Sequence, residues 1–431
     1  MNFIFFLNSS MAGHVKKSIV ALFIVMPGIC FAQTTDTLQH INAERRNSAE
    51  MQSKPYVILI SADGFRYDYA KKYQAEHLLE LSKAGVQASS MIPSFPSVTF
   101  PNHYTLVTGM YPAHHGLVNN TFLDEKRNEK YSMSAKDKVR DGSWYGGTPL
   151  WVLAEQQQMI AASMFWVGSE AAVQGVRPTY YYDYTEQIKP DARIRAVKQW
   201  LSLPADRRPH LITFYLSEPD HAGHSFGPDA PETEKAVKEV DSIIFQLTEA
   251  VKSTGLNVNF IFVADHGMTA VDREHPIATP SAIDPEKFTI ASSGTMMDVH
   301  AKNKADVGPL YEQLKKTEQD YKVYLKSNMP AKYHYSSVDD RMNHIGDILL
   351  IPEWPKVFSN RKPGVGYHGF DPAVVKDMHA TFFAWGPAFK KNKMIGSFEN
   401  VNVYPLITEI LGLSYSEKID GDKKILHGIL K

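Results

Sequence analysis

Short apolar runs alternate with amphipathic stretches over most of the chain. The runs at 56–60, 211–216 and 260–263 are rich in β-branched and aromatic residues, which is typical of parallel strands buried on both faces. Helical spacing of apolar residues is clearest at 231–253. This alternation predicts an α/β fold with a mostly parallel central sheet and helices on both faces.

The pattern changes between about residues 277 and 366. This region holds one strand-like run, 288–291, and one helical stretch, 304–319, among many Lys, Tyr, Asn and Pro residues. Strand and helix patterns resume after it, from 381–385 onward. Because a chain of 431 residues exceeds the size at which one simple core stops growing, a subdomain is expected. We predict a catalytic domain over 55–431 with an inserted cap around 277–366.

The N-terminal segment has the pattern of a secretory signal. Two lysines precede an apolar run at 18–29, and Ala32 is a small residue suited to cleavage. The run is shorter than the ~20 residues that cross a bilayer, which favours cleavage over a retained membrane anchor. We expect residues 1–32 to be a signal peptide, residues 33–54 a polar linker, and the mature protein to be exported.

The charge balance and the single cysteine indicate which partners and covalent cross-links to expect. Lys and Arg number 46 against 47 Asp and Glu, so bulk charge gives no reason to expect a nucleic-acid partner. No protein partner is indicated. The single cysteine, Cys30, lies in the predicted signal, so the mature chain would contain no disulfide. Its stability must then come from packing and bound metal.

Acidic residues follow three predicted strands, each beside a Gly, Pro or His that interrupts regular structure. These residues are Asp63, Asp220 and Asp265. One Asp–His spacing proves nothing among 17 histidines and 47 acidic residues, but three such coincidences argue against ordinary surface carboxylates. Carboxyl ends of parallel strands meet at one edge, and oxygen and imidazole ligands without thiolates suit zinc. Two ions ~4 Å apart could clamp both oxygens of a phosphoryl displacement.

A candidate nucleophile, Thr99, lies in the segment 95–104. Thr99 could begin a helix that has Pro101 in its first turn. In the simplest interpretation Thr99 only caps this helix. The two roles are compatible, because a helix N-terminus also directs N–H groups and positive dipole at a phosphate.

Six segments together resemble the nucleotide pyrophosphatase/phosphodiesterase family of the alkaline phosphatase superfamily. They occur in family order across the predicted mature chain, at 61–66, 99–104, 108–112, 218–224, 265–268 and 366–369. The resemblance implies an alkaline phosphatase-like fold and a phosphoric diester hydrolase. Since the additional domains of large animal members are not found in this sequence, a bacterial periplasmic enzyme is the simplest expectation.

The resemblance also implies two zinc sites. One zinc ion would be held by Asp220, His224 and His368. The other would be held by Asp63, Asp265, His266 and the Thr99 oxygen. Thr99 would attack phosphorus to give a phosphothreonine, which water then hydrolyses.

Further residues are implied to bind the substrate. Asn120 would donate to a non-bridging phosphate oxygen, joined by the backbone N–H of Thr99 or its neighbour. Phe100 and Tyr184 would stack on the base, although an aromatic run such as 180–184 also suits packing. Protein donors then hold a single non-bridging oxygen, and the motifs suggest no arginine for a terminal phosphate. A nucleotide diester or anhydride, releasing a nucleoside 5′-monophosphate, is therefore the expected substrate.

Two alternatives use the same residues differently. A choline-type glycerophosphodiester or lysophospholipid phosphodiesterase would keep the metals and replace the base slot with an aromatic and acidic cage. A binding protein would keep the fold without the chemistry. The second alternative is disfavoured because every expected ligand and Thr99 are present.

Overall fold

The computed structural model describes residues 37–431. The predicted signal peptide, residues 1–32 with Cys30, lies outside the described residues. Among the helices described, none has the length and apolar character needed to cross a membrane.

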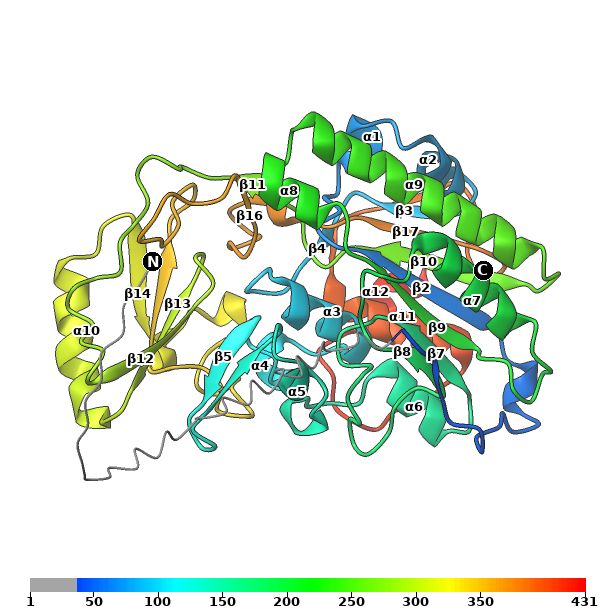
Figure 1. The fold of residues 1–431 in the computed structure, drawn as a ribbon, viewed down its shortest axis with the longest axis horizontal. Coiled ribbons are helices and arrows are strands. Elements are labelled where there is room, and N and C mark those ends of the chain that lie inside the picture. Colours follow the sequence, from blue (N-terminus) through cyan, green and yellow to red (C-terminus); the bar gives the residue numbers. More distant parts are fainter. Residues whose placement is uncertain (1–36) are drawn as a thin grey trace, which may run out of the picture. The chain divides into compact units, whose positions relative to one another are not determined.

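A mixed sheet of nine strands forms the centre of the fold, in the order β1-β8-β7-β9-β2-β10-β17-β3-β18 (Figure 1). In that order the strands are His40–Ile41, Tyr180–Tyr182, Ala161–Met164, Leu211–Leu216, Tyr56–Ala62, Val258–Val263, Phe382–Trp385, Val86–Ala88 and Lys393–Ile395. The five strands from β8 to β10 run parallel, whereas β17 is antiparallel to both of its neighbours. The three strands predicted from buried apolar runs are β2, β9 and β10, and the predicted fold class is confirmed.

Helices cover both faces of this sheet (Figure 1). One layer contains α2 (Glu76–Lys83), α7 (Pro190–Leu201) and α9 (Pro231–Lys252), and α9 packs against both of the others. The other contains α3 (Thr99–Thr108) and α11 (Val403–Leu411), and α11 contacts both α3 and β2. The remaining helices are α1 (Tyr69–Lys72), α4 (Pro112–His115), α5 (Lys136–Val139), α6 (Leu150–Gln156), α8 (Asp220–Phe226), α10 (Val307–Lys316) and α12 (Lys423–His427).

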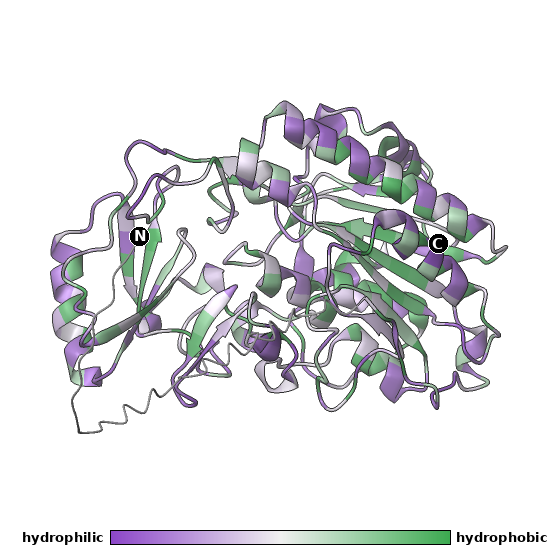
Figure 2. Cartoon of the chain, viewed as in Figure 1, coloured by the Kyte–Doolittle hydropathy of each residue, from purple (hydrophilic) through white to green (hydrophobic). Residues whose placement is uncertain are grey.

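The hydrophobic residues gather on the strands and the inner helix faces, while polar residues cover the outer faces (Figure 2). Helix α9 illustrates the cause. Its buried residues include Val237, Val240, Ile244, Leu247 and Val251, which recur every three or four positions and so share one face. Burial of this face against the sheet holds the helix in place.

A second, four-stranded sheet lies within the region predicted as an insert. Its antiparallel strands follow the order β12 (Phe288–Ser292), β13 (Met297–Ala301), β15 (Ile348–Pro352) and β14 (Tyr321–Leu325). Together with α10 it has a hydrophobic cluster of its own. The division of the chain into a catalytic domain and a cap stays a prediction.

Short paired strands join this region to the rest of the fold. β11 (Thr269–Ala270) and β16 (Gly366–Tyr367) are antiparallel partners, so the chain leaves and returns at adjacent points. Two further two-stranded sheets lie outside this region: β4 (Met91–Ile92) pairs with β19 (Phe398–Glu399), and β5 (Thr121–Asp124) pairs with β6 (Glu129–Ser132). The β11–β16 pair matters most for function, because Asp265 and His266 shortly precede β11 and His368 directly follows β16.

The segment predicted as a polar linker, 33–54, packs on the large sheet over its described part. β1 pairs with β8, and Asn47 is 4% exposed. The Asn47 amide donates to the carbonyls of Ala205 and Arg208 and accepts from the Ile160 N–H. Polar composition alone gave no indication of these contacts.

Replacement of a core aromatic residue tests this packing. Phe262 is fully buried in β10, so Phe262→Ala should lower the free energy of unfolding by about 3–5 kcal/mol. Phe226 is 54% exposed, and Phe226→Ala should change it by less than about 0.5 kcal/mol. Urea unfolding followed by circular dichroism measures both variants. Equal losses would show that β10 is not a core strand.

Candidate active site

Three neighbouring parallel strands bring the predicted acidic residues to one edge of the sheet. Asp63 directly follows β2, Asp265 lies two residues beyond β10, and Asp220 starts α8 shortly after β9. Since β9, β2 and β10 are adjacent and parallel, their carboxyl ends share this edge. The structure gathers the six predicted carboxylates and imidazoles there into two groups.

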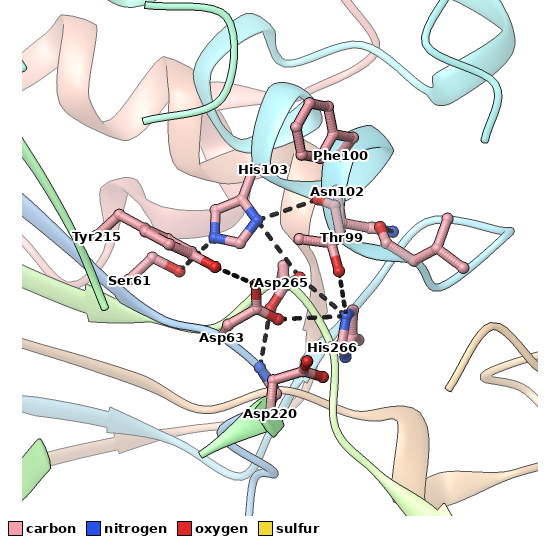
Figure 3. Close-up of polar contacts among 12 residues, drawn as sticks. Ser61, Asp63, Thr99, Phe100, Asn102, His103, Tyr215, Asp220, Asp265 and His266 are labelled. Atoms are coloured by element: carbon pink, nitrogen blue, oxygen red, sulfur yellow. Dashed lines mark hydrogen bonds and ion pairs between the residues drawn. The ribbon is translucent and has the colours of Figure 1, made fainter. Parts of the chain in front are cut away.

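The first group contains Asp63, Asp265 and His266 (Figure 3). His266 Nε2 lies 2.9 Å from Asp265 Oδ2 and 3.5 Å from Asp63 Oδ1. The other carboxylate oxygens are held by protein donors: the Tyr215 hydroxyl donates to Asp63 Oδ2 over 2.7 Å, and the Gly64 N–H donates to Asp265 Oδ1 over 3.1 Å. These bonds orient both carboxylates toward His266.

The second group contains Asp220, His224 and His368. Nε2 of His224 and Nε2 of His368 lie 3.1 Å apart, and they are 3.4 and 3.8 Å from Asp220 Oδ1. Nδ1 of His224 donates to the Gly366 carbonyl, and Nδ1 of His368 donates to the Ser97 carbonyl. A histidine bonded in this way through one ring nitrogen presents the other to a metal.

The two groups lie side by side, because the rings of His266 and His368 stack with centroids 3.6 Å apart. Three buried carboxylate oxygens at this position have no hydrogen-bond partner, namely Asp63 Oδ1, Asp220 Oδ1 and Asp265 Oδ2. Burial and the charges of Asp265 and Asp220 hold the pKa of Asp63 well above its usual range. Divalent cations would offset this repulsion and use the free oxygens, so the residues fit a metal centre.

Thr99 is the first residue of α3, and its side chain faces the first group (Figure 3). The residue at the helix cap is Val98, with extended backbone, so Thr99 does not occupy the capping position. Instead, its hydroxyl lies 3.2 Å from His266 Nε2. This places a half-buried hydroxyl beside the candidate metal ligands, at a helix N-terminus.

Asn120 is bound to the residue that follows Thr99. The Phe100 N–H donates to Asn120 Oδ1 over 2.8 Å, so the acceptor end of the amide is occupied and its Nδ2 donors remain for a ligand. The Phe100 N–H is thus engaged by Asn120 in this structure. The backbone donor to phosphate, the N–H of Thr99 or of its neighbour, stays a prediction.

A cavity of about 430 Å³ is lined by Thr99, by Asp63 of the first group and by Asp220 of the second. Phe100 and Tyr184 both line it, and Tyr184 is 38% exposed. The Tyr184 ring meets Phe165 edge to face at 5.6 Å, and its hydroxyl donates to Glu186. The cavity thus has an aromatic wall on which a planar group could stack.

Comparison with known protein families shows to which family this chain belongs. The family model described as type I phosphodiesterase / nucleotide pyrophosphatase matches residues 57–371. The chain belongs to this family. The predicted resemblance is thereby confirmed.

Similar proteins of the family come from animals and yeast. Rat ectonucleotide pyrophosphatase/phosphodiesterase family member 1 is 35% identical over 388 residues, which cover 85% of this chain and 41% of the rat protein. The chain thus spans about two fifths of that relative. An uncharacterized pyrophosphatase/phosphodiesterase of Schizosaccharomyces pombe is 34% identical over 381 residues, covering 83% of this chain and 77% of the yeast protein.

Solved structures show the same fold. Murine ectonucleotide pyrophosphatase/phosphodiesterase 5 superposes with a TM-score of 0.81 at 28% identity, covering 87% of this chain and 100% of the murine chain. An inactive threonine-to-alanine variant of the murine protein has been solved in complex with AMP. The alkaline phosphatase-like α/β architecture is therefore supported by sequence and by structure.

Sequence reasoning missed two residues that hold the site together. Tyr215 lies inside the apolar strand β9, where nothing distinguishes it from a packing residue. His103 lies in the segment with Thr99 but received no role. A polar ring one helical turn after a nucleophile was the available signal. Trp166 is 1% exposed, and its ring N–H donates to the His103 carbonyl. Trp166 therefore supports the position of His103.

Zinc addition to chelator-treated protein tests the metal centre. Zinc should raise the unfolding temperature, because a cation that binds only the folded state stabilises it by about 2.7 kcal/mol at 100 times Kd. Asp63→Asn should raise the unfolding temperature of the metal-free protein and reduce the effect of zinc. Asp137→Asn, at a side chain that is 77% exposed, is the control. An unchanged melting curve for zinc-treated wild type would contradict a metal site.

Proposed function

We propose that the chain is an exported phosphodiesterase with two zinc ions, hydrolysing phosphodiester and phosphoanhydride bonds of nucleotides to release nucleoside 5′-monophosphates. The observation that carries the proposal is the position of the Thr99 hydroxyl. Thr99 is the first residue of a helix and lines an aromatic cavity, and its hydroxyl contacts the first of two neighbouring groups of metal-type ligands. Membership in the type I phosphodiesterase family supports the same reaction class.

Each group would hold one zinc ion. The first ion would be bound by Asp63, Asp265, His266 and the Thr99 oxygen, and the second by Asp220, His224 and His368. When bound, zinc supplies Lewis-acid stabilisation of phosphate oxygens and a lower pKa for a bound hydroxyl.

The chain itself supplies the nucleophile and its orientation. A bond forms from Thr99 Oγ1 to phosphorus as the bond to the leaving oxygen breaks, which gives a phosphothreonine. Water then attacks phosphorus and the Thr99–phosphorus bond breaks. Each displacement inverts the configuration, so the reaction proceeds with net retention. Asn120 Nδ2 and the Thr99 N–H would donate to one non-bridging oxygen, where charge develops.

The cavity supports a nucleotide as the group that is retained. Its volume of about 430 Å³ lies within the range of small-ligand pockets. Phe100 and Tyr184 offer ring faces or edges to a base, and stacking of this kind contributes about 1–3 kcal/mol per base. Glu170 and Glu186 also line the cavity, but Glu170 accepts from Arg140 and the Tyr184 N–H, and Glu186 accepts from the Tyr184 hydroxyl. The cavity is thus closer to a stacking slot than to a choline cage.

We also propose that the protein is exported from the cytoplasm. Residues 1–32 would direct the protein across the membrane and be removed, and a bacterial periplasm is the proposed destination. Family relatives named for ectoenzymes and for snake venom support an exported protein.

Replacement of the nucleophile is the most direct test. Thr99→Ala should lower kcat at least about 1,000-fold, since a covalent mechanism loses its attacking oxygen. Zinc content, measured by atomic absorption, should stay close to wild type because six other ligands remain. Thr99→Ser keeps the hydroxyl and should retain far more activity. Equal kcat for wild type and Thr99→Ala would reject the mechanism.

A substrate panel tests the proposed specificity. Thymidine 5′-monophosphate p-nitrophenyl ester should be hydrolysed with a much higher kcat/KM than p-nitrophenyl phosphate, because the site suits a diester and a base. Tyr184→Ala should raise KM for the nucleotide ester without the same effect on a bis(p-nitrophenyl) ester. Turnover of glycerophosphocholine without turnover of ATP would instead favour the choline alternative.

A further inference from the structure

A fully buried histidine, His103, contacts three parts of the candidate site (Figure 3). It lies on α3, one turn beyond Thr99. Its Nε2 is 2.8 Å from the Ser61 hydroxyl on β2. Its Nδ1 is 3.0 Å from the Thr99 carbonyl oxygen and 3.3 Å from Asp265 Oδ2. One side chain therefore links the nucleophile, a candidate metal ligand and the central strand.

The surroundings of the ring determine which nitrogen carries the proton. Nδ1 faces a carbonyl oxygen and a carboxylate oxygen, and both of these are acceptors. Nδ1 must therefore carry a hydrogen and donate it. Ser61 has a hydroxyl that can donate, so Nε2 can accept from it. The Ser61 bond thus favours the tautomer that keeps the donor directed at Thr99 and Asp265.

The bond from His103 completes a clamp on the backbone next to the nucleophile. The peptide unit between Thr99 and Phe100 is held at its carbonyl by His103 and at its N–H by Asn120. Both bonds come from side chains, and both are about 3 Å long or shorter. A peptide plane fixed at both ends restricts the rotation that would move the Thr99 side chain away from the metal ligands.

Aromatic packing holds the His103 ring in this position. The ring meets Trp166 and Tyr215 edge to face, with centroids 5.3 and 5.2 Å away. Tyr215 is also the donor to Asp63. The residues that fix His103 thus also fix the ligand on the adjacent strand.

We propose that His103 is a positioning residue, which sets the distance between the Thr99 hydroxyl and the group Asp63, Asp265 and His266. It touches neither substrate nor metal, and it acts through Nδ1, which donates to the Thr99 carbonyl and faces Asp265 Oδ2 at 3.3 Å. The proposal rests on the proposed function, because it assigns to Thr99 the role of nucleophile. Loss of such supporting contacts around a metal ligand costs about 10–100-fold in metal affinity or activity.

Two substitutions separate the two nitrogens of the ring. In His103→Asn the amide Nδ2 can take the place of Nδ1 and donate to Thr99. In His103→Gln the amide reaches instead toward the position of Nε2 and Ser61. His103→Gln should lower kcat about 10–100-fold with KM for the nucleotide ester nearly unchanged, whereas His103→Asn should recover most of kcat.

His115 provides the matched control. His115 is also fully buried, and its Nε2 bonds to Thr105 of α3, the helix that carries His103. No contact between His115 and either ligand group is found. His115→Gln should lower the unfolding temperature as His103→Gln does, and it should leave kcat within a few-fold of wild type in the folded protein. Equal losses of kcat in the two variants would show that His103 acts through stability alone.

Zinc binding gives a readout that does not depend on turnover. Zinc binding is titrated over a series of free zinc concentrations, each buffered by a chelator. His103→Gln should need about 10-fold more free zinc than wild type to half-fill one of its sites, while His115→Gln should match wild type. Unchanged zinc binding together with unchanged kcat in His103→Gln would overturn the proposal. If wild type hydrolyses no diester, the proposed function fails, and the zinc comparison still decides whether His103 positions Asp265.

Discussion

Repulsion among three buried carboxylates is the constraint on which the rest of this structure depends. Asp63, Asp220 and Asp265 each have an oxygen that is shielded from solvent and lacks a hydrogen-bond partner. Protein donors satisfy other oxygens of Asp63 and Asp265 but leave these free. Water cannot screen the charges at this depth, and the proposed cations would offset the repulsion that raises the pKa of Asp63. The imidazoles beside the carboxylates would complete the ligand sets of such ions.

Sheet topology creates this concentration of charge. Strands β9, β2 and β10 are neighbours in space but not in sequence, and their parallel direction places three chain segments at one edge. The N-terminus of α3 is directed at the same edge, with Thr99 as its first residue. An antiparallel arrangement of these strands would have sent one carboxylate to the opposite side. The parallel centre is thus a requirement of the site.

The sequence was informative where local pattern and chemistry coincide. Asp63 and Asp265 could be found because each follows a run that is apolar enough to be a buried strand. His368 could not be found in this way, since it follows the short strand β16 and reaches the site through pairing with β11. It entered through family resemblance alone. Tyr215 had no signal in the sequence, and the only signal for His103 was its position one helical turn after Thr99. The roles of both residues arise from contacts across strands and helices that spacing does not encode.

The region between β11 and β16 is coupled to the second ligand group by close backbone contact. His224 Nδ1 donates to the carbonyl of Gly366 in β16. A Cβ atom at position 366 would lie 2.2 Å from the carbonyl oxygen of Gly223, so only glycine lets β16 approach α8 this closely. A shift of β16 would therefore move His224 through its hydrogen bond and His368 through the chain. The point where this region joins the rest of the fold must therefore keep both histidines directed at Asp220.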